Sequence, residues 1–394
     1  MRRAFDISKK INKDFNTRSS QDIRLYSTIM PLDSIRKGEF HDSGKPYLKV
    51  SGTPYEIGFQ HGVFASKQIH RAIEIYSKLY KDAQNVDWEL ARSRASRYEE
   101  PIKSKYPEIW EELEGISKGA GLETLDILAL NTRSEITLVK ISDGCTALAQ
   151  RNKSTGEVWV GQNWDWIPEI DEATFFLEVE QPDKPSILIL AEAGIIGKYG
   201  FNSAGVGAML NAIPSNQVSF DGLPVHFALR KALEQKSVND ALVYLENNKV
   251  SSSANFLLAD PKTYLTLEVS PLGNKVIEAD EKTGAVWHTN HFLDKDLEQS
   301  LSTGEPILSS FERLDRVKEL TDPDADANYD VFRERLSDIE NSPHGICRIG
   351  TGGTGLSGCV TLYTIVINTN KKEGIITLGR PSDKSLQKYK LYFE

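Results

Sequence analysis

The amino-acid pattern changes at Asp143-Gly144, and this change constrains the fold more than any other feature of the chain. Before it, apolar side chains recur at helical spacing, for example Ile69, Ile73 and Tyr76. After it, short runs of β-branched and aromatic residues dominate, as in residues 264–269. Helices first and many strands later, without regular βα alternation, predict an α+β layered fold.

Local signals place the elements more closely. A Thr53-Pro54 pair starts the first helix, Thr124 and Ser237 are the expected N-caps of two others, and glycines at 119–121 end the second. Helices are predicted over residues 54–83, 88–118, 124–136, 224–235, 238–247, 306–320 and 329–339. Strands are predicted over residues 158–160, 175–179, 187–190, 256–258, 264–269, 362–367 and 375–378, the last two joined by a hairpin loop over 368–374.

The chain of 394 residues contains no internal repeat and no long low-complexity linker. Residues 46–394 are therefore interpreted as one compact unit, mainly helical over 46–144 and strand-rich over 145–394. Residues 1–45 form a polar extension, interpreted as disordered or loosely docked. Its arginines among serines and threonines make a mitochondrial targeting segment the alternative, against which its aspartates argue.

Charge and cysteine content bear on partners and compartment. A net charge of −9 argues against a phosphate-binding surface, so no nucleic-acid partner is expected. Three cysteines do not suit a secreted disulfide framework and favour a reducing, intracellular and cytoplasmic setting. No apolar run approaches the roughly 18 residues that span a bilayer, so no membrane association is expected.

Several common site motifs are missing from the sequence. It contains no GxxxxGK[ST], no HExxH and no CxxC, so no metal and no nucleotide or other cofactor is expected. His288 and His291 stand close together after a short strand-like run, and one of them is interpreted as a structural histidine.

Cys145 is the most informative residue. On its own, a cysteine after a flexible glycine is most simply a small buried hydrophobe. Asn163-Trp-Asp165 follows one strand and a turn later, and a hairpin would bring Asp165 back beside the start of the Cys145 strand. Asn211, Asn290 and Arg348 also stand at strand ends in polar contexts, which makes Cys145 a candidate nucleophile.

Ten motifs in a fixed order give the chain a family resemblance from about residue 50 to its C-terminus. They are Thr53-Pro-Tyr-Glu-Ile-Gly58, Leu130-Asn-Thr-Arg-Ser-Glu135, Asp143-Gly-Cys-Thr146, Gly161-Gln-Asn-Trp-Asp165, Glu192-Ala-Gly-Ile-Ile-Gly-Lys198, Gly200-Phe-Asn-Ser-Ala-Gly-Val206, Ala228-Leu-Arg-Lys-Ala-Leu-Glu234, His288-Thr-Asn-His291, Ile346-Cys-Arg348 and Leu378-Gly-Arg-Pro381. In these motifs the chain resembles the acyl-CoA:6-aminopenicillanic acid acyltransferase (isopenicillin N acyltransferase) family of N-terminal-nucleophile hydrolases.

The resemblance implies a precursor that cuts itself between Gly144 and Cys145 into chains 1–144 and 145–394, which stay together as a heterodimer in one four-layer αββα sandwich. Glycine suits the strained turn expected at the cleavage site because it lacks a Cβ. The new α-amine of Cys145 would act as the general base for the Cys145 thiol, since its reference pKa is about 8.

Further site residues are carried over from the family. Asp165 would orient the α-amine, and the Asn290 amide would donate a hydrogen bond to the oxyanion. Ser270 matches a serine near the acyl site, with a strand-end turn as its alternative role. Arg348 would hold a substrate carboxylate or make a structural ion pair.

The sequence also departs from the family. Where the penicillin-forming enzymes have Ser-Arg-Gly, this chain has Ser357-Gly-Cys359, and its C-terminus lacks their peroxisomal tripeptide. Penicillin-type substrate recognition is therefore in doubt, whereas the nucleophile set is intact. The predicted function is acyl transfer from an amide or CoA thioester to an amine or water. The alternatives are a hydrolase of β-alanyl or N-acyl amines and a non-catalytic binding relative.

Overall fold

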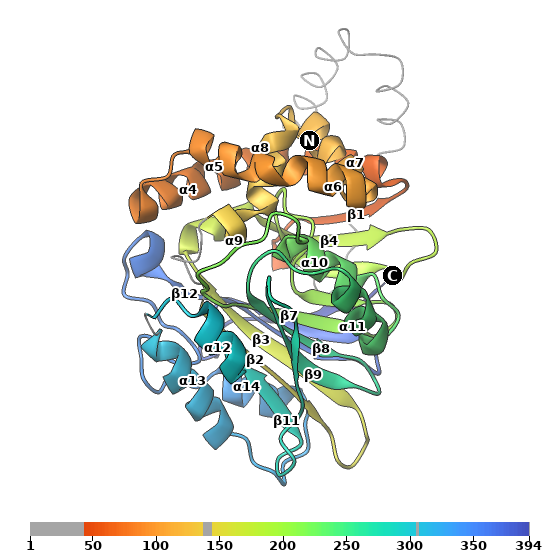
Figure 1. Ribbon diagram of the computed structural model, residues 1–394. Coiled ribbons are helices and arrows are strands. Elements are labelled where there is room, and N and C mark those ends of the chain that lie inside the picture. Colours follow the sequence, from red (N-terminus) through yellow and green to blue (C-terminus); the bar gives the residue numbers. More distant parts are fainter. Residues whose placement is uncertain (1–42, 137–143, 305–306, 394) are drawn as a thin grey trace, which may run out of the picture.

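The computed structural model describes residues 43–136, 144–304 and 307–393. The predicted N-terminal extension, residues 1–45, lies outside the described residues except for its last three. Among the described residues, strands form one sheet of eight and one of six, and helices cover both (Figure 1). This arrangement confirms the predicted α+β fold.

The eight-stranded sheet has mostly antiparallel neighbours. Its order is β1 (Tyr47–Ser51), β4 (Thr174–Glu180), β5 (Ile187–Glu192), β6 (Gly200–Asn202), β7 (Gly207–Ala212), β8 (Ala254–Ala259), β9 (Tyr264–Val269) and β10 (Lys275–Ile277). The exception is β1, which pairs with β4 in parallel and so attaches the N-terminal segment to the edge of the sheet.

The six-stranded sheet carries the Gly144-Cys145 junction. Its order is β11 (Ala285–His288), β2 (Gly144–Arg151), β3 (Val158–Trp166), β12 (Val360–Asn368), β13 (Glu373–Leu378) and β14 (Lys388–Leu391). The predicted C-terminal hairpin is confirmed, because β12 and β13 pair antiparallel from Asn368 opposite Glu373. Since β2 and β3 lie between β11 and β12, the junction lies within the sheet rather than at its edge.

The two sheets pack face to face, with β2 and β3 against β7 and β8. Helices α10 (Val225–Leu233) and α11 (Val238–Asn247) cover the outer face of the larger sheet, and α10 contacts β6 and β7. Helices α13 (Leu308–Glu319) and α14 (Tyr329–Leu336) pack on β2, β3, β11 and β12. The result is the four-layer αββα sandwich, drawn with the N-terminal helices above it in Figure 1.

The N-terminal helices are shorter than the sequence pattern predicts. The predicted helix 54–83 is two helices, α3 (Pro54–Phe64) and α4 (Ser66–Gln84). The predicted helix 88–118 is α5 (Trp88–Ala95), a 3-10 turn, α6 (Glu99–Lys105) and α7 (Pro107–Ala120). Proline in the helix interior removes a backbone donor and clashes with the preceding turn, which explains why α7 restarts at its own proline.

The predicted caps are partly right. Thr53 and Ser237 cap their helices through side-chain acceptors, and Gly121 ends α7 in the left-handed conformation. The prediction for Thr124 is wrong, because Glu123 is the N-cap of α8 (Thr124–Asn131) in a reciprocal pair with Asp126. The short helix α12 (Lys295–Leu301) was not predicted.

The largest of three hydrophobic clusters among the described residues runs through the molecule. It joins buried residues of the N-terminal helices, such as Ile69 and Leu113, to strand residues such as Phe175 and Leu188. The segments before and after Gly144 therefore share a core. Among the described residues, no helix combines the length and the apolar character needed to cross a membrane.

Candidate active site

The strand register brings the predicted site residues to one end of the six-stranded sheet. In the β2–β3 hairpin, Gly144 lies opposite Asp165 and Cys145 lies opposite Trp164. On the other side of β3, Thr361 of β12 lies opposite Asp165. The predicted return of Asp165 to the start of the Cys145 strand is therefore confirmed, and the carboxylate lies beside the Gly144-Cys145 peptide bond.

Cys145 is buried, with 1% of its surface exposed. It shares the inter-sheet core with Ala147 and Ala149, whereas the side chain of Thr146 contacts Arg313 of α13 on the helix side of the sheet. This alternation follows from the two-residue period of a strand. The Cys145 side chain thus faces the space between the two sheets.

The Asn290 amide contacts the Cys145 backbone directly. The backbone N–H of Cys145 donates to Asn290 Oδ1 at 2.9 Å, and Arg313 Nη2 donates to the same oxygen at 2.8 Å. Asn290 Nδ2 donates to the carbonyl of Ala212 at 3.0 Å. An amide nitrogen carries two N–H groups, so the second one can serve an oxyanion that forms beside Cys145.

Arg313 is a site residue that the sequence analysis did not identify. Its Nη1 donates to the Cys145 carbonyl at 2.5 Å and to Thr146 Oγ1 at 3.0 Å. Burial lowers the pKa of Arg313 to about 10. The nearby Asp165 raises this pKa, and the nearby Arg348 lowers it further. The group stays protonated at neutral pH, and because a guanidinium can only donate, it fixes the oxygen of the Asn290 amide toward Cys145.

The Asp165 carboxylate is fully buried and held by two neighbouring residues. The Thr361 hydroxyl donates to Asp165 Oδ1 at 2.5 Å and accepts from the backbone N–H of Arg348 at 2.8 Å. Arg348 Nε lies 4.0 Å from Asp165 Oδ2, the spacing of an ion pair. This geometry favours the structural ion pair over the substrate-carboxylate role for Arg348. Thr361 is a second residue that the sequence analysis did not identify.

A cluster of buried charged side chains lies next to Trp164 of β3. These charged residues stand in two of the family motifs. Glu192 accepts hydrogen bonds from Lys198 and Arg133 at 2.5 and 3.2 Å, and from the Tyr76 hydroxyl. Burial raises the pKa of Glu192, but Arg133 and Lys198 together outweigh burial and lower it to about 2. Lys198 Nζ lies 3.9 Å from the ring centre of Trp164, the residue opposite Cys145. The cluster therefore supports the face of β3 that lies beside the thiol.

Position 144 requires glycine because a side chain has no room there, not because the backbone forms a strained turn. It is the first residue of β2, and its backbone is not in the left-handed region. A Cβ at this position would lie 2.8 Å from Asp165 Oδ2, 2.9 Å from Asp165 Cβ and 3.2 Å from Arg348 Cζ. The expected turn is thus corrected to a tight extended strand in which only glycine lets the carboxylate approach.

Gly144→Ala is expected to lower the rate of chain cleavage by about 10²-fold, because misplacement of reacting groups by roughly 1 Å has this effect. The measurement is the cleaved fraction on a denaturing gel over time after synthesis. Gly374→Ala in β13 is the matched control, since a Cβ there would make only ordinary contacts, at 3.4 Å or more, and its backbone is not in the left-handed region. Cleavage of Gly144→Ala at the wild-type rate would contradict this account of the junction.

Two other residues singled out in the sequence have local structural contacts. The Ser270 hydroxyl donates to Gly273 O at 2.7 Å and accepts from the Leu272 N–H at 3.2 Å, which is the alternative strand-end turn role. His288 is fully buried and contacts Glu268 Oε1 through Nε2 at 2.8 Å, as expected for a structural histidine. Neither residue contacts Cys145 in the hydrogen bonds of the described residues.

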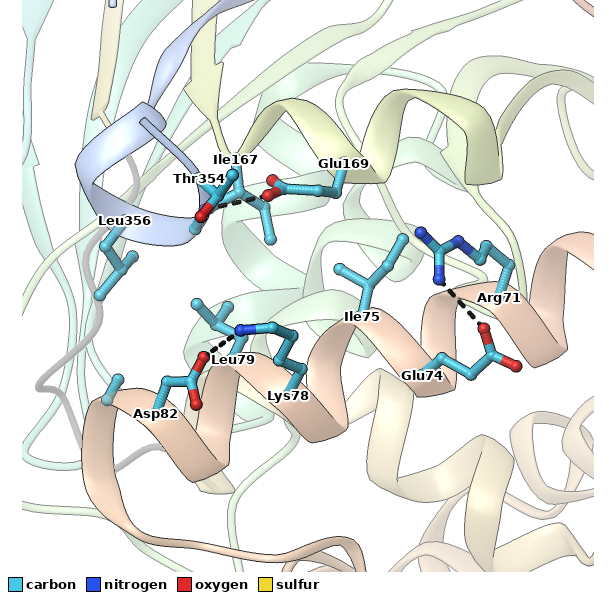
Figure 2. A pocket seen from close by; sticks show the side chains of 12 residues that line it. Arg71, Glu74, Ile75, Lys78, Leu79, Asp82, Ile167, Glu169, Thr354 and Leu356 are labelled. Atoms are coloured by element: carbon cyan, nitrogen blue, oxygen red, sulfur yellow. Dashed lines mark hydrogen bonds and ion pairs between the residues drawn. The ribbon is translucent and has the colours of Figure 1, made fainter. Parts of the chain in front are cut away.

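Two cavities lie at the end of the sheet that carries Gly144. One, of about 280 Å³, lies between α4, Ile167 and the 3-10 turn η6 (Gly355–Gly358). Figure 2 shows Ile75 and Leu79 of α4 on one wall and Ile167 and Leu356 across from them, with charged side chains of both signs around them. Ile167 is two residues beyond Asp165 in the chain, but Cys145, Asp165 and Asn290 are not among the residues that line this cavity.

The other cavity, of about 240 Å³, has Asn290 in its wall. Its remaining lining comes from the residues after β7, from the loop after β11, from α12 and the residues that follow it, and from the start of α13. It borders the site on the β11 side. No group of three or more His, Cys, Asp or Glu side chains in the described part of the chain is placed to hold a metal ion.

Comparisons with known proteins identify the family. A family model described as acyl-coenzyme A:6-aminopenicillanic acid acyl-transferase matches residues 151–383. The acyl-coenzyme A:6-aminopenicillanic-acid-acyltransferase 40 kDa form of Emericella nidulans is 34% identical, over 86% of this chain and 93% of that protein. The chain belongs to this acyltransferase family. It is accordingly an enzyme of the acyltransferase and amidohydrolase type, as the sequence predicts.

Two further proteins are similar to this acyltransferase-family chain. Beta-alanyl-dopamine/carcinine hydrolase of Drosophila melanogaster is 24% identical, over 77% of this chain and 85% of that protein. Among solved structures, a variant of conjugated bile acid hydrolase from Clostridium perfringens has a TM-score of 0.46 and 16% identity, over 63% of this chain and 92% of that chain.

The departure from the family at Gly358 has a structural counterpart. A Cβ at Gly358 would lie 2.2 Å from the carbonyl oxygen of Gly353, within the turn that borders the first cavity. The turn therefore has no room for the arginine that the penicillin-forming enzymes carry in this stretch.

Proposed function

We propose that the chain is a precursor that cuts itself between Gly144 and Cys145 and then uses Cys145 to transfer or hydrolyse acyl groups on amides or CoA thioesters. One observation carries this proposal. The Gly144-Cys145 bond lies between the Asp165 carboxylate and the Asn290 amide, whose oxygen accepts the Cys145 N–H at 2.9 Å.

Self-cleavage starts with attack of the Cys145 thiol on the Gly144 carbonyl carbon. The peptide C–N bond breaks, a thioester forms between Gly144 and the Cys145 sulfur, and the nitrogen takes up the proton that the thiol gives up. Water then hydrolyses the thioester, which leaves a carboxylate on Gly144 and both a thiol and an α-amine on Cys145. The Asp165 carboxylate, which lies against Gly144, is proposed to stabilise the proton on that nitrogen.

The cleaved enzyme then has its nucleophile and base in one residue. The α-amine, with a reference pKa of about 8, takes the thiol proton as sulfur attacks the substrate carbonyl. The second N–H of Asn290 Nδ2 donates to the oxyanion, and Arg313 keeps the amide in that orientation. The ammonium returns its proton to the leaving amine or thiol, and water or an amine then resolves the acyl-enzyme.

The two chains are proposed to stay together as a heterodimer after cleavage. Strand β1, from the first chain, pairs with β4 of the second along five residues, and both chains contribute to the same hydrophobic core. A hydrophobic core to which both chains contribute stabilises their association, because separating the chains would expose its apolar side chains to water. Residues 46–394 would thus remain one compact unit.

The proposed substrates are small-molecule acyl donors, with an amine or water as acceptor. The relatives act, by their names, on 6-aminopenicillanic acid with acyl-coenzyme A and on β-alanyl-dopamine or carcinine. Hydrolysis of β-alanyl or N-acyl amines is therefore the second candidate. A non-catalytic binding role is disfavoured, because Cys145, Asp165 and Asn290 lie together at the strand ends.

The test is mass spectrometry of purified wild-type protein followed by assays with acyl-CoAs, N-acyl amino acids and β-alanyl amines. Dividing 44.1 kDa by residue number, 144 and 250 of 394, gives about 16 and 28 kDa for the cleaved chains. Release of free thiol identifies a CoA thioester as the acyl donor, whereas release of free amine identifies an amide as the donor. A full-length chain that is active would refute the proposed mechanism.

A further inference from the structure

The cavity between α4 and η6 is a candidate binding site of its own, because the described residues that line it do not include Cys145, Asp165 or Asn290. We propose that it binds a small organic cation, a primary ammonium ion on a compact apolar body, and that the Glu169 carboxylate holds the ammonium group. This inference goes beyond the proposed function and does not depend on the chemistry of Cys145. We call this cavity the Glu169 cavity.

The Glu169 carboxylate has spare hydrogen-bonding capacity. Its Oε1 accepts the backbone N–H of Gly355, the first residue of η6, at 3.0 Å. No described residue donates a hydrogen bond to its Oε2, although this atom is shielded from solvent. A shielded carboxylate oxygen without a donor is unfavourable. A donor that enters the cavity would relieve this, and the soft rotation about the last side-chain bond of glutamate lets either oxygen face such a donor.

The cations in the cavity wall already have carboxylate partners. Arg71 Nη1 lies 3.0 Å from Glu74 Oε2, and Lys78 pairs with Asp82. Figure 2 shows these two ion pairs along α4, with Glu169 on the wall across from them. Glu169 itself forms no ion pair with another described residue. The wall thus carries two positive and three negative side chains, and the carboxylate that remains without a cation favours a cationic ligand.

The remaining part of the wall is apolar and suits the body of such a ligand. Ile75 and Leu79 of α4 lie across the cavity from Ile167 and Leu356 (Figure 2). Leu356 is a large apolar side chain with 38% of its surface exposed. A ligand that packs against Leu356 would remove this apolar area from water, which favours binding.

The volume of the cavity limits the ligand to a small molecule. The cavity measures about 280 Å³. Pockets that enclose a whole drug-sized ligand range over roughly 300–1,000 Å³, so one ring or branched chain with a single ammonium group matches the available space. A ligand of about nine non-hydrogen atoms is expected to bind with a Kd of about 0.1–1 mM.

The test is isothermal titration calorimetry on wild-type protein and on Cys145→Ala. Three probes share a phenyl ring on a short chain and differ in charge: 2-phenylethylamine is a cation, 2-phenylethanol is neutral and 3-phenylpropanoate is an anion. The amine is expected to bind at least about tenfold more tightly than the alcohol, and the anion more weakly than either. Cys145→Ala should bind the amine as wild type does, because the thiol is not part of the cavity wall.

Two variants separate the carboxylate from the apolar wall. Glu169→Gln keeps an oxygen for the Gly355 N–H but removes the charge, so it should weaken amine binding about tenfold or more and change alcohol binding less than about threefold. Leu356→Ala should weaken both by about three- to tenfold, because both lose the same apolar contact. Glu246→Gln is the matched control, since Glu246 is an exposed carboxylate beside the apolar groove of α11 and β10, and it should change neither affinity. Thermal unfolding checks that each variant is folded.

Three results would overturn the proposal. They are no saturable binding of the amine to wild type up to about 10 mM, equal affinity for the amine and the anion, and unchanged amine affinity in Glu169→Gln. Amine binding that is lost in Cys145→Ala but kept in Glu169→Gln would place the amine at the catalytic site. That outcome would also overturn this inference, while the proposed function of Cys145 would stand.

Discussion

Replacement of Cys145 with alanine is expected to leave one chain of 44.1 kDa and to lower kcat/KM by at least about 10⁴-fold. The reason is that, in the proposed mechanism, one sulfur performs both reactions. It would attack the Gly144 carbonyl during cleavage and the substrate carbonyl during turnover, and the α-amine that would serve as base exists only after cleavage. A denaturing gel and steady-state kinetics measure the two effects on the same preparation.

The other two cysteines provide matched controls. Cys347 and Cys359 are buried as Cys145 is, and none of the three forms a disulfide. Burial raises the pKa of the Cys347 thiol, and its sulfur is hydrogen-bonded to Ser382 Oγ at 3.2 Å, so it is a poor nucleophile. Cys347→Ala should be cleaved and active. Loss of activity in Cys347→Ala with full activity in Cys145→Ala would reverse the assignment.

Asn290→Ala is expected to lower kcat/KM by about 10²–10³-fold in protein that has been cleaved, the scale for one lost oxyanion donor. KM should change less than kcat, because the hydrogen bond strengthens mainly in the transition state. The measurement is steady-state kinetics on variants whose cleavage is first verified by gel. Cleavage itself need not use the same donor, so it is expected to suffer less.

Asn290→Asp separates the donor role from a role in folding. A carboxylate can still accept from Arg313 Nη2 and the Cys145 nitrogen, as the amide oxygen does now, but it cannot donate to an oxyanion. Its activity should therefore be at least as low as that of the alanine variant. Asn202→Ala is the control, since this buried asparagine of β6 bonds to Leu233 and Gln235. Near wild-type kcat/KM for Asn290→Asp would remove Asn290 from the oxyanion role.

The sequence predicts the helical first part and the strand-rich second part well because helical and strand periodicities are local properties, whereas the four-layer arrangement follows from the family resemblance. It is less successful where strands contain polar residues. Strand β3 extends from Val158 to Trp166, whereas the pattern predicts only residues 158–160. The extra part contains Gln162 and Asn163, whose amides bond to Leu210 and to Leu336 and Ile346 in distant elements. Such partners are not visible in a local pattern.

The candidate site shows the same limit. Cys145, Asp165 and Asn290 stand in motifs that the chain shares with its family. Arg313 is 168 positions from its contact Cys145 in the sequence, and Thr361 is 196 positions from its contact Asp165. Each of these two residues lies in an ordinary helix or strand sequence. Nothing in the spacing of Arg313 within an amphipathic helix distinguishes it from a surface arginine. Only the packing of α13 on β2 shows its role.

The central claim is that Cys145, once it is the first residue of the second chain, carries the acyl group. Intact-mass spectrometry after rapid mixing of cleaved wild-type enzyme with a hexanoyl thioester tests it most directly. The account predicts that the chain of about 28 kDa gains the mass of one hexanoyl group less one hydrogen, on Cys145, while the chain of about 16 kDa is unchanged. Acylation of any other residue, or labelling of uncleaved Cys145→Ala to the same extent, would contradict the account.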